Sequence, residues 1–232
     1  MSLGDDLRAY VKSTFVSQWK TREGNVVPSP EDVTLDNTAV HFEKATILYA
    51  DLARSTNIVD NKFWTFASEI YKNYLYTCSR LIKNEGGEIT AYDGDRVMGV
   101  FIGDNQCSCA AKCALKINYT VQNIINPAIS AQYSTANFSV TQCVGIDVSE
   151  VHVSRTGVRG DNDLVWVGKA ANYAAKLTDL SAEGPTWITE AVFLQLSNES
   201  KYAGDGTLMW QKRSWTPMGG MTIYVSTYWW SV

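Results

Sequence analysis

The chain has 232 residues, a formal net charge of −4 and 45% hydrophobic residues, a composition typical of globular proteins. This acidic balance argues against a broad nucleic-acid surface, which requires a basic stripe. No apolar run reaches the roughly 18–20 residues that cross a bilayer, and the N-terminal sequence MSLGDDLRAY lacks the layout of a signal peptide. We therefore expect a cytoplasmic protein that binds neither nucleic acid nor membrane.

The first 40 residues differ in character from the rest of the chain. Apolar residues at helical spacing predict an amphipathic helix over residues 3–20. The polar segment TREGNVVPSPEDVTLDN, which follows it, contains two prolines and is typical of a connector. We interpret residues 1–40 as an N-terminal extension, packed on the core or on a second subunit, and residues 41–232 as the main domain.

The first half of the main domain predicts a strand, a helix and a hairpin. The segment ATILYADLA is a short apolar run, as expected of a buried strand. Residues 61–84 have helical periodicity and end at the glycines of EGG. In EITAYDGDRVMGVF, residues alternate on both sides of Asp93-Gly94, which predicts a two-residue hairpin turn there.

The second half continues the same alternation. A helix is expected over residues 105–126, ending before Pro127, and FSVTQCVGIDVSEVHVSRTG predicts strands. A further helix is expected from about Gly168, and the aromatic C-terminal segment predicts a closing β-hairpin and a dimer contact. The order β-α-β-β-α-β predicts an α+β fold, ferredoxin-like or palm-like, with helices on one face and additional C-terminal strands.

Cysteine and histidine do not form a recognisable metal motif. Cys107, Cys109 and Cys113 cluster in an alanine-rich segment but lack paired CxxC spacing. We expect small buried thiols of a reduced protein. The two histidines, His41 and His152, are likewise expected to be structural.

Two aspartates stand where the predicted sheet ends. Asp51 closes the first strand of the domain, and Asp95 lies just past the hairpin turn. In a β-α-β-β arrangement these two segments are neighbours, so both carboxylates can reach one point. Hard oxygen ligands suit Mg²⁺ or Mn²⁺ bound together with substrate phosphates. The alternative is two unrelated surface acids, with Asp95 serving only the turn.

Three motifs resemble those of the class III adenylate and guanylate cyclases. They are YADLARST at 49–56, DGDRVMGVF at 93–101 and VGKAANYAAK at 167–176, in the order of that family. The resemblance covers residues 43–200 and identifies the chain as a class III nucleotidyl cyclase. It implies a homodimer that closes a nucleoside triphosphate into a 3′,5′-cyclic monophosphate with release of pyrophosphate.

The resemblance also implies roles for individual residues. Asp51, Asp95 and the Leu52 carbonyl would bind two Mg²⁺ or Mn²⁺ ions. The turn after Asp51 would hold the triphosphate through its backbone N–H groups. Its residues are Ala53, Arg54, Ser55 and Thr56.

Asn172 would orient the ribose, and Lys176 would stabilise charge on the α-phosphate. They are four residues apart on one helix face. The family usually has arginine in place of Lys176, and lysine keeps the charge without the bidentate fork. In the family the metal-binding aspartates and this pair come from opposite subunits, which implies two composite sites per homodimer.

The positions that recognise the base depart from both purine patterns. Adenylate cyclases have a lysine and an aspartate where this chain has Ala91 and Val165, and the glutamate and cysteine of guanylate cyclases are absent too. Tyr49 is a bulky residue beside the expected base. This combination resembles the bacterial pyrimidine cyclases of Pycsar antiphage signalling, whose cyclic UMP or cyclic CMP activates a separately encoded effector. The resemblance predicts a pyrimidine cyclase that prefers UTP to CTP.

Other functions remain open at this stage. A purine cyclase, a palm-type transferase and an inactive nucleotide-binding dimerisation module would share the same fold. Among the basic residues, Arg54 is the best candidate for a phosphate contact, because it follows the metal-site strand directly. Arg96, Arg155 and Arg159 are expected to be solvated loop charges.

Overall fold

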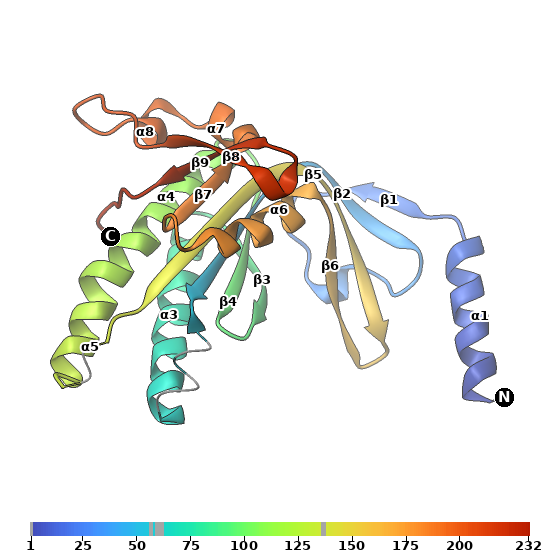
Figure 1. Ribbon diagram of the computed structural model, residues 1–232. Helices are drawn as coiled ribbons and strands as arrows, with labels where there is room; N and C mark the ends of the chain where they lie inside the picture. The colour runs from blue at the N-terminus through green and yellow to red at the C-terminus, as the bar shows by residue number, and fades with distance from the viewer. Residues whose placement is uncertain (1, 56–57, 59–62, 136–137) are drawn as a thin grey trace. The chain divides into compact units, whose positions relative to one another are not determined.

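The computed structural model in Figure 1 describes residues 2–55, 58, 63–135 and 138–232. The chain forms two compact units. The smaller unit comprises residues 1–43 and 150–168, and the larger unit comprises residues 44–149 and 169–232. Among the described residues, no helix is both long and apolar enough to cross a membrane.

The larger unit contains most of the helices. The α-helices among the described residues are α1 (Leu3–Val16), α3 (Trp64–Asn84), α4 (Gln106–Thr120), α5 (Asn126–Gln132), α6 (Lys169–Leu177), α7 (Glu190–Gln195) and α8 (Asn198–Lys201). The remaining helical turns are η1 (Pro30–Asp32), η2 (Val121–Ile125), η3 (Thr178–Leu180) and η4 (Thr216–Met218).

The described strands form one nine-stranded sheet. Seven follow each other in the order β3-β4-β2-β5-β7-β9-β8, while β1 pairs with β2 and β6 pairs with β5. The strands are β1 (Lys20–Glu23), β2 (Thr38–Ala53), β3 (Glu88–Asp93), β4 (Arg96–Phe101), β5 (Thr141–Val158), β6 (Asp161–Gly168), β7 (Thr186–Thr189), β8 (Gln211–Trp215) and β9 (Met221–Ser226). The order β2-α3-β3-β4-α4-β5 confirms the predicted α+β fold class, and β8 and β9 form the predicted C-terminal hairpin.

In the larger unit, helices cover both faces of the sheet. The inward-facing residues of β2 belong to a core cluster with residues of α3 and α4. On the other face, Cys143 of β5 packs with Leu177 of α6 and Trp187 of β7. Gly145 allows this contact, because a Cβ atom there would collide with the Ala174 carbonyl. The prediction that all helices lie on one face of the sheet is therefore correct for α3 and α4 but wrong for α6, which lies on the opposite face.

Helix α3 forms where the apolar periodicity predicted it. Its buried residues recur at intervals of one turn and face the core, and they include Phe66, Ile70, Tyr74, Cys78 and Ile82. The glycines after it end the helix as expected, because Gly86 has the left-handed φ of 83°.

The helix after β4 differs from the prediction at its end. It passes through a π-helical turn, η2, and continues as α5 across Pro127 instead of stopping before it. The Asn126 N–H donates to the Val121 carbonyl five residues earlier, at the junction with α5. Pro127 is then in the first turn of α5, where a missing N–H costs little.

The β3–β4 hairpin turns one residue later than predicted. Asp93 pairs with Arg96, so the two loop residues are Gly94 and Asp95. Gly94 has a φ of 60°, as required at the first loop position of the favoured hairpin turns. Asp95 is therefore part of the turn itself and not the first residue after it.

The smaller unit contains a strand that the sequence did not predict. β1 pairs in parallel with β2, although the segment was interpreted as a connector. All four of its residues are exposed, so no apolar pattern marks it. Helix α1 confirms the predicted helix but ends at Val16, four residues before the predicted end, and buries none of its residues within the described part of the chain. At the C-terminal end of α1, the side-chain amide of Asn37 donates hydrogen bonds to the carbonyl oxygens of Thr14 and Ser17.

One buried acid gives a testable pH dependence. Asp147 of β5 is 3% exposed and accepts a hydrogen bond from the Thr189 hydroxyl. Burial raises the pKa of Asp147 from 3.8 to about 6. The folded protein therefore holds the carboxyl proton of Asp147 more tightly than the unfolded chain does. The stability that Asp147 contributes falls as the pH rises from about 4 to about 6.

We expect Asp147→Asn to increase the free energy of unfolding by about 3 kcal/mol above pH 6 and to change it little below pH 4. Asparagine keeps an oxygen for Thr189 and removes the buried charge. Urea unfolding of both proteins between pH 4 and pH 7 measures the difference. An equal difference at every pH would contradict this account of the buried carboxylate.

Candidate active site

The register of two antiparallel strands places Asp51 opposite the hairpin. Ala50 of β2 pairs with Val97 of β4, so Asp51 lies across from Arg96. The guanidinium Nη2 of Arg96 donates to Asp51 Oδ2 at 2.7 Å, and both side chains are largely buried. The first predicted metal ligand is thus paired with a cation of the same chain.

The alternation of β2 decides which face Asp51 occupies. Leu48, Ala50 and Leu52 belong to the core cluster that contains residues of α3 and α4. Side chains along a strand alternate between its faces, so Tyr49 and Asp51 lie on the opposite face. Helix α6 packs on that same face of the larger unit.

Asp95 directly precedes Arg96 in the turn of the β3–β4 hairpin, one position from the residue opposite Asp51. Oδ2 of Asp95 is buried and has no hydrogen-bond partner among the described residues. Burial raises the pKa of Asp51 and Arg96 opposes this rise, while the charges of Asp95 and Asp179 add to it. The structure therefore brings the two predicted metal ligands together in a place with an excess of negative charge.

Two of the three residues expected around the base, Tyr49 and Ala91, flank the same strand. Met98 of β4 pairs with Tyr49 on one side and with Ala91 on the other. Tyr49 is half-buried, and Arg96 Cζ lies 5.9 Å from the centre of its ring. Val165 lies on β6 in the smaller unit and is largely exposed.

The turn that follows β2 has an unusual backbone. Arg54 is exposed and has a φ of 60°, a conformation that non-glycine residues rarely adopt. Before it, Ala53 ends β2, and after it, the Ser55 side chain bonds to that of Tyr71. Thr56, the last residue of the predicted phosphate turn, lies outside the described residues.

Helix α6 presents the predicted catalytic pair to solvent. The Ala170 N–H in its first turn donates to the Ser149 hydroxyl at 2.9 Å. Asn172 and Lys176 are both exposed, one turn apart. Within the described residues, Asn172 makes no hydrogen bond and Lys176 reaches only the sulfur of Met218, at 3.9 Å.

Two features of this site were not predicted. Arg96 was expected to be a solvated loop charge but is the ion-pair partner of Asp51. Asp179, just after α6, is close enough to affect the pKa of Asp51, although no motif marks it. Arg155 was also expected to be solvated, but it bonds to Asn162 and to the Val33 carbonyl. Arg159 is exposed, as expected, and Arg54, the candidate for a phosphate contact, is exposed too.

Comparison with known proteins identifies the family. No protein-family model matches the chain. It is 50% identical to the uridylate cyclase of Burkholderia cepacia and 47% identical to that of Xanthomonas perforans, in both cases over 100% of each chain. The chain belongs to the uridylate cyclase family. This confirms the predicted pyrimidine cyclase resemblance.

Solved cyclase structures share the family's fold. The guanylyl cyclase Cya2 aligns with a TM-score of 0.69 at 16% identity, over 83% of this chain and 95% of that one. A dimeric guanylyl cyclase domain from the fungus Blastocladiella emersonii aligns with a TM-score of 0.62 at 16% identity, over 79% and 96%. The expected class III cyclase fold is confirmed.

Proposed function

We propose that this chain converts UTP to 3′,5′-cyclic UMP and pyrophosphate. The substrate assignment follows the relatives, which are named uridylate cyclases and match the chain from end to end. The observation that carries the chemistry is the strand register that places Asp51 and Asp95 at neighbouring positions, with a buried oxygen of Asp95 that lacks a partner among the described residues.

The donor set fits divalent cations. Two carboxylates and the Leu52 carbonyl are hard oxygen ligands, and the partnerless Oδ2 of Asp95 is the kind of atom that a cation satisfies. Two Mg²⁺ or Mn²⁺ ions would lower the pKa of the ribose 3′-hydroxyl and neutralise the leaving pyrophosphate. Arg96, which pairs with Asp51 in this structure, must share or release that carboxylate for this to occur.

The remaining groups bind and orient the substrate in this proposal. Backbone N–H groups of the turn from Ala53 to Thr56 hold the triphosphate, and the exposed Arg54 adds a positive charge. Asn172 holds the ribose, and Lys176 places its ammonium at the α-phosphate, where charge develops during ring closure. Positioning and charge stabilisation then carry the rate, without a covalent nucleophile.

We further propose a homodimer with two composite sites. Asn172 and Lys176 are exposed and almost without partners among the described residues, which suits groups that complete a site on a second subunit. Helix α1 adds an exposed apolar face, with Leu7 57% and Phe15 86% exposed. The catalytic domain proposed here is residues 41–232, with residues 1–40 as an extension.

Tyr49 is proposed to select the pyrimidine. Its backbone pairs with that of Met98 on β4, and the guanidinium carbon of Arg96 lies 5.9 Å from the centre of its ring. A half-buried aromatic side chain at this position fills volume that the second ring of a purine would need. Ala91 lacks the polar group with which a purine cyclase would recognise its base at that position.

We expect Tyr49→Ala to lower kcat/KM for UTP by about 10-fold and to raise the ratio of ATP or GTP turnover to UTP turnover. The smaller side chain removes a contact to the pyrimidine and opens space for a purine. Tyr92→Ala is the matched control, because Tyr92 is an exposed tyrosine of β3. Parallel assays with each triphosphate measure both effects, and an unchanged base preference would remove Tyr49 from this role.

The reaction itself is tested with purified protein, UTP and Mn²⁺. Cyclic UMP and pyrophosphate should appear in equal amounts, because each ring closure releases one pyrophosphate. Pyrophosphate without a cyclic product would indicate hydrolysis or nucleotidyl transfer and would exclude the proposal. The same assay with CTP in place of UTP tests the proposed preference, and we expect a lower rate with CTP.

We propose a cytoplasmic signalling role for the product. Cyclic UMP would act on a separately encoded effector as a second messenger of antiphage defence, as the sequence resemblance implies. Bacteria that carry the active chain together with its effector should resist phage, whereas a chain with Asp51→Ala should not protect them. Equal protection by both chains would exclude this role.

A further inference from the structure

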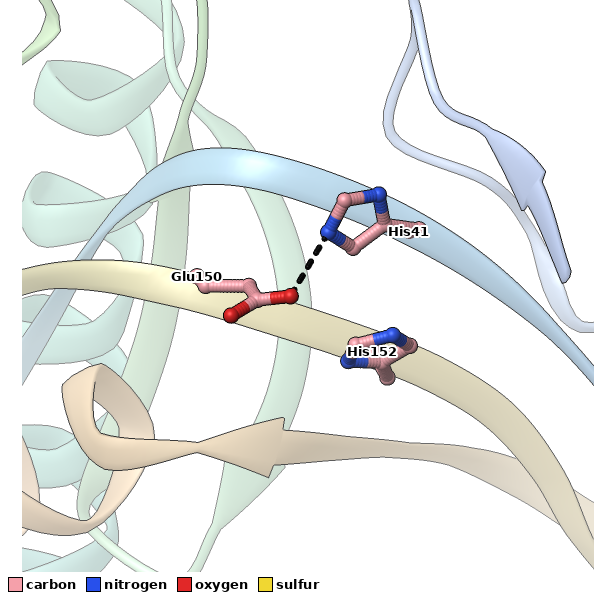
Figure 2. A group of neighbouring side chains, drawn as sticks. All are labelled: His41, Glu150 and His152. Atoms are coloured by element: carbon pink, nitrogen blue, oxygen red, sulfur yellow. Dashed lines mark hydrogen bonds and ion pairs between the residues drawn. The ribbon is translucent and has the colours of Figure 1, made fainter.

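The smaller unit contains a cluster of imidazoles and carboxylates that the cyclase reaction does not use. His41 lies on β2, while Glu150 and His152 lie on β5, two residues apart and therefore on one face of that strand. Figure 2 shows the three side chains as neighbours on these two strands. Their candidate ligand atoms all lie within 4.8 Å of one another.

The contacts within the cluster are direct. Nε2 of His41 lies 2.9 Å from a carboxylate oxygen of Glu150, and Nδ1 lies 2.8 Å from a carboxylate oxygen of Glu23 on β1. The rings of His41 and His152 have their centres 4.7 Å apart. Two imidazoles and two carboxylates thus converge from three strands, with His41 in the middle.

We propose that His41, Glu150 and His152 form a Zn²⁺ site. Imidazole nitrogen favours zinc and other transition metals over Mg²⁺, which prefers oxygen ligands. A set of two histidines and one glutamate, with water in the fourth position, is an established tetrahedral zinc environment. This site is separate in residues and in donor chemistry from the carboxylate pair of Asp51 and Asp95.

The distances are compatible with zinc after small side-chain movements. Ligand atoms about 2.1 Å from a tetrahedral ion are separated from each other by about 3.4 Å. The 2.9 Å between His41 and Glu150 is below this value, and the widest separation of 4.8 Å is above it. Rotation of the exposed Glu150 side chain and of the His152 ring can close the gap, without movement of the strands.

Glu23 is not one of the three proposed zinc ligands but contacts His41, which is. Histidines that bind zinc commonly donate their other ring N–H to a carboxylate, which fixes the tautomer and strengthens the ligand. Glu23 takes this position at Nδ1 of His41, leaving Nε2 directed at Glu150. A bound ion would join β2 to β5, and through Glu23 also β1, so the site would stabilise the smaller unit.

Zinc titration of the untagged, metal-stripped full-length chain tests this proposal. Isothermal titration calorimetry should give one tight Zn²⁺ per chain, and the melting temperature should rise with zinc. Substitution with Co²⁺ should produce visible d–d bands without the thiolate-to-cobalt band that cysteine ligands would give. Binding weaker than about 100 μM, or a thiolate band, would overturn the site.

Variants separate a zinc site from a hydrogen-bond network. His41→Gln with His152→Gln should weaken zinc binding at least 100-fold, and Glu23→Gln should weaken it by about 10–100-fold. Glu43→Gln is the matched control, because this exposed glutamate of β2 is outside the group. Asp51→Ala should leave zinc binding unchanged, so the result stands whatever triphosphate the chain uses. Equal zinc affinity in all variants would refute the proposal.

Discussion

Replacing Asp51 by alanine is expected to reduce cyclic UMP formation by about 10³-fold or more, because metal ions at this kind of site supply several kcal/mol of transition-state stabilisation. The side chain carries one of the two carboxylates proposed to bind the metal ions, near the C-terminal end of β2. Its removal leaves Asp95 alone and also releases Arg96 from its ion pair. Initial rates with UTP at saturating Mn²⁺ measure the loss.

The hairpin offers a matched control for this loss. Asp93 is an exposed acid directly before the turn, two residues from Asp95. Asp93→Ala changes the local charge by the same amount as Asp51→Ala and should retain most of the activity. Circular dichroism of both variants establishes that they fold. Comparable losses in the two variants would mean that overall negative charge matters and not metal ligation by Asp51.

Mixing two inactive variants is expected to restore activity. In each proposed composite site, one subunit supplies the metal-binding aspartates and the other supplies Asn172 and Lys176 of α6. Asp51→Ala disables the first part of the site, and Lys176→Ala disables the second. After subunit exchange at equal amounts, half of the dimers are mixed, and each has one site with both sides intact. The mixture should therefore recover about a quarter of the unmodified activity.

This recovery depends only on the composite arrangement. If all catalytic groups of a site came from one chain, every site in a mixed dimer would remain defective and no activity would return. A mixture of Asp51→Ala with Asp95→Ala is the control, because both changes affect the same side of the site. That mixture should stay inactive.

Much of this site follows from local sequence patterns. The strand that contains Asp51 and the hairpin near Asp95 are both marked by apolar residues and turn residues, although the strand runs two residues past Asp51 to Ala53. Asn172 and Lys176 lie on one exposed helix face, as their spacing of four predicts. These features depend on residues near each other in the chain, which is where periodicity is informative.

The features that were missed depend on pairing between distant segments. The ion pair of Arg96 with Asp51 follows from the register of β2 against β4, which no single segment reveals. The shift of the hairpin by one residue has the same origin. The cluster around His41 joins residues 109 positions apart, and β1 is an exposed strand without an apolar pattern. Tertiary pairing, and not local preference, produces each of these.

Competition among the four ribonucleoside triphosphates is the most direct test of the central claim. Purified chain is incubated with equal concentrations of ATP, GTP, CTP and UTP and with Mn²⁺, and the cyclic products are separated and identified by mass spectrometry. The proposed function predicts cyclic UMP as the main product, cyclic CMP as a minor one, and loss of both in Asp51→Ala. Cyclic AMP or cyclic GMP as the main product would contradict the pyrimidine specificity assigned to Tyr49 and Ala91.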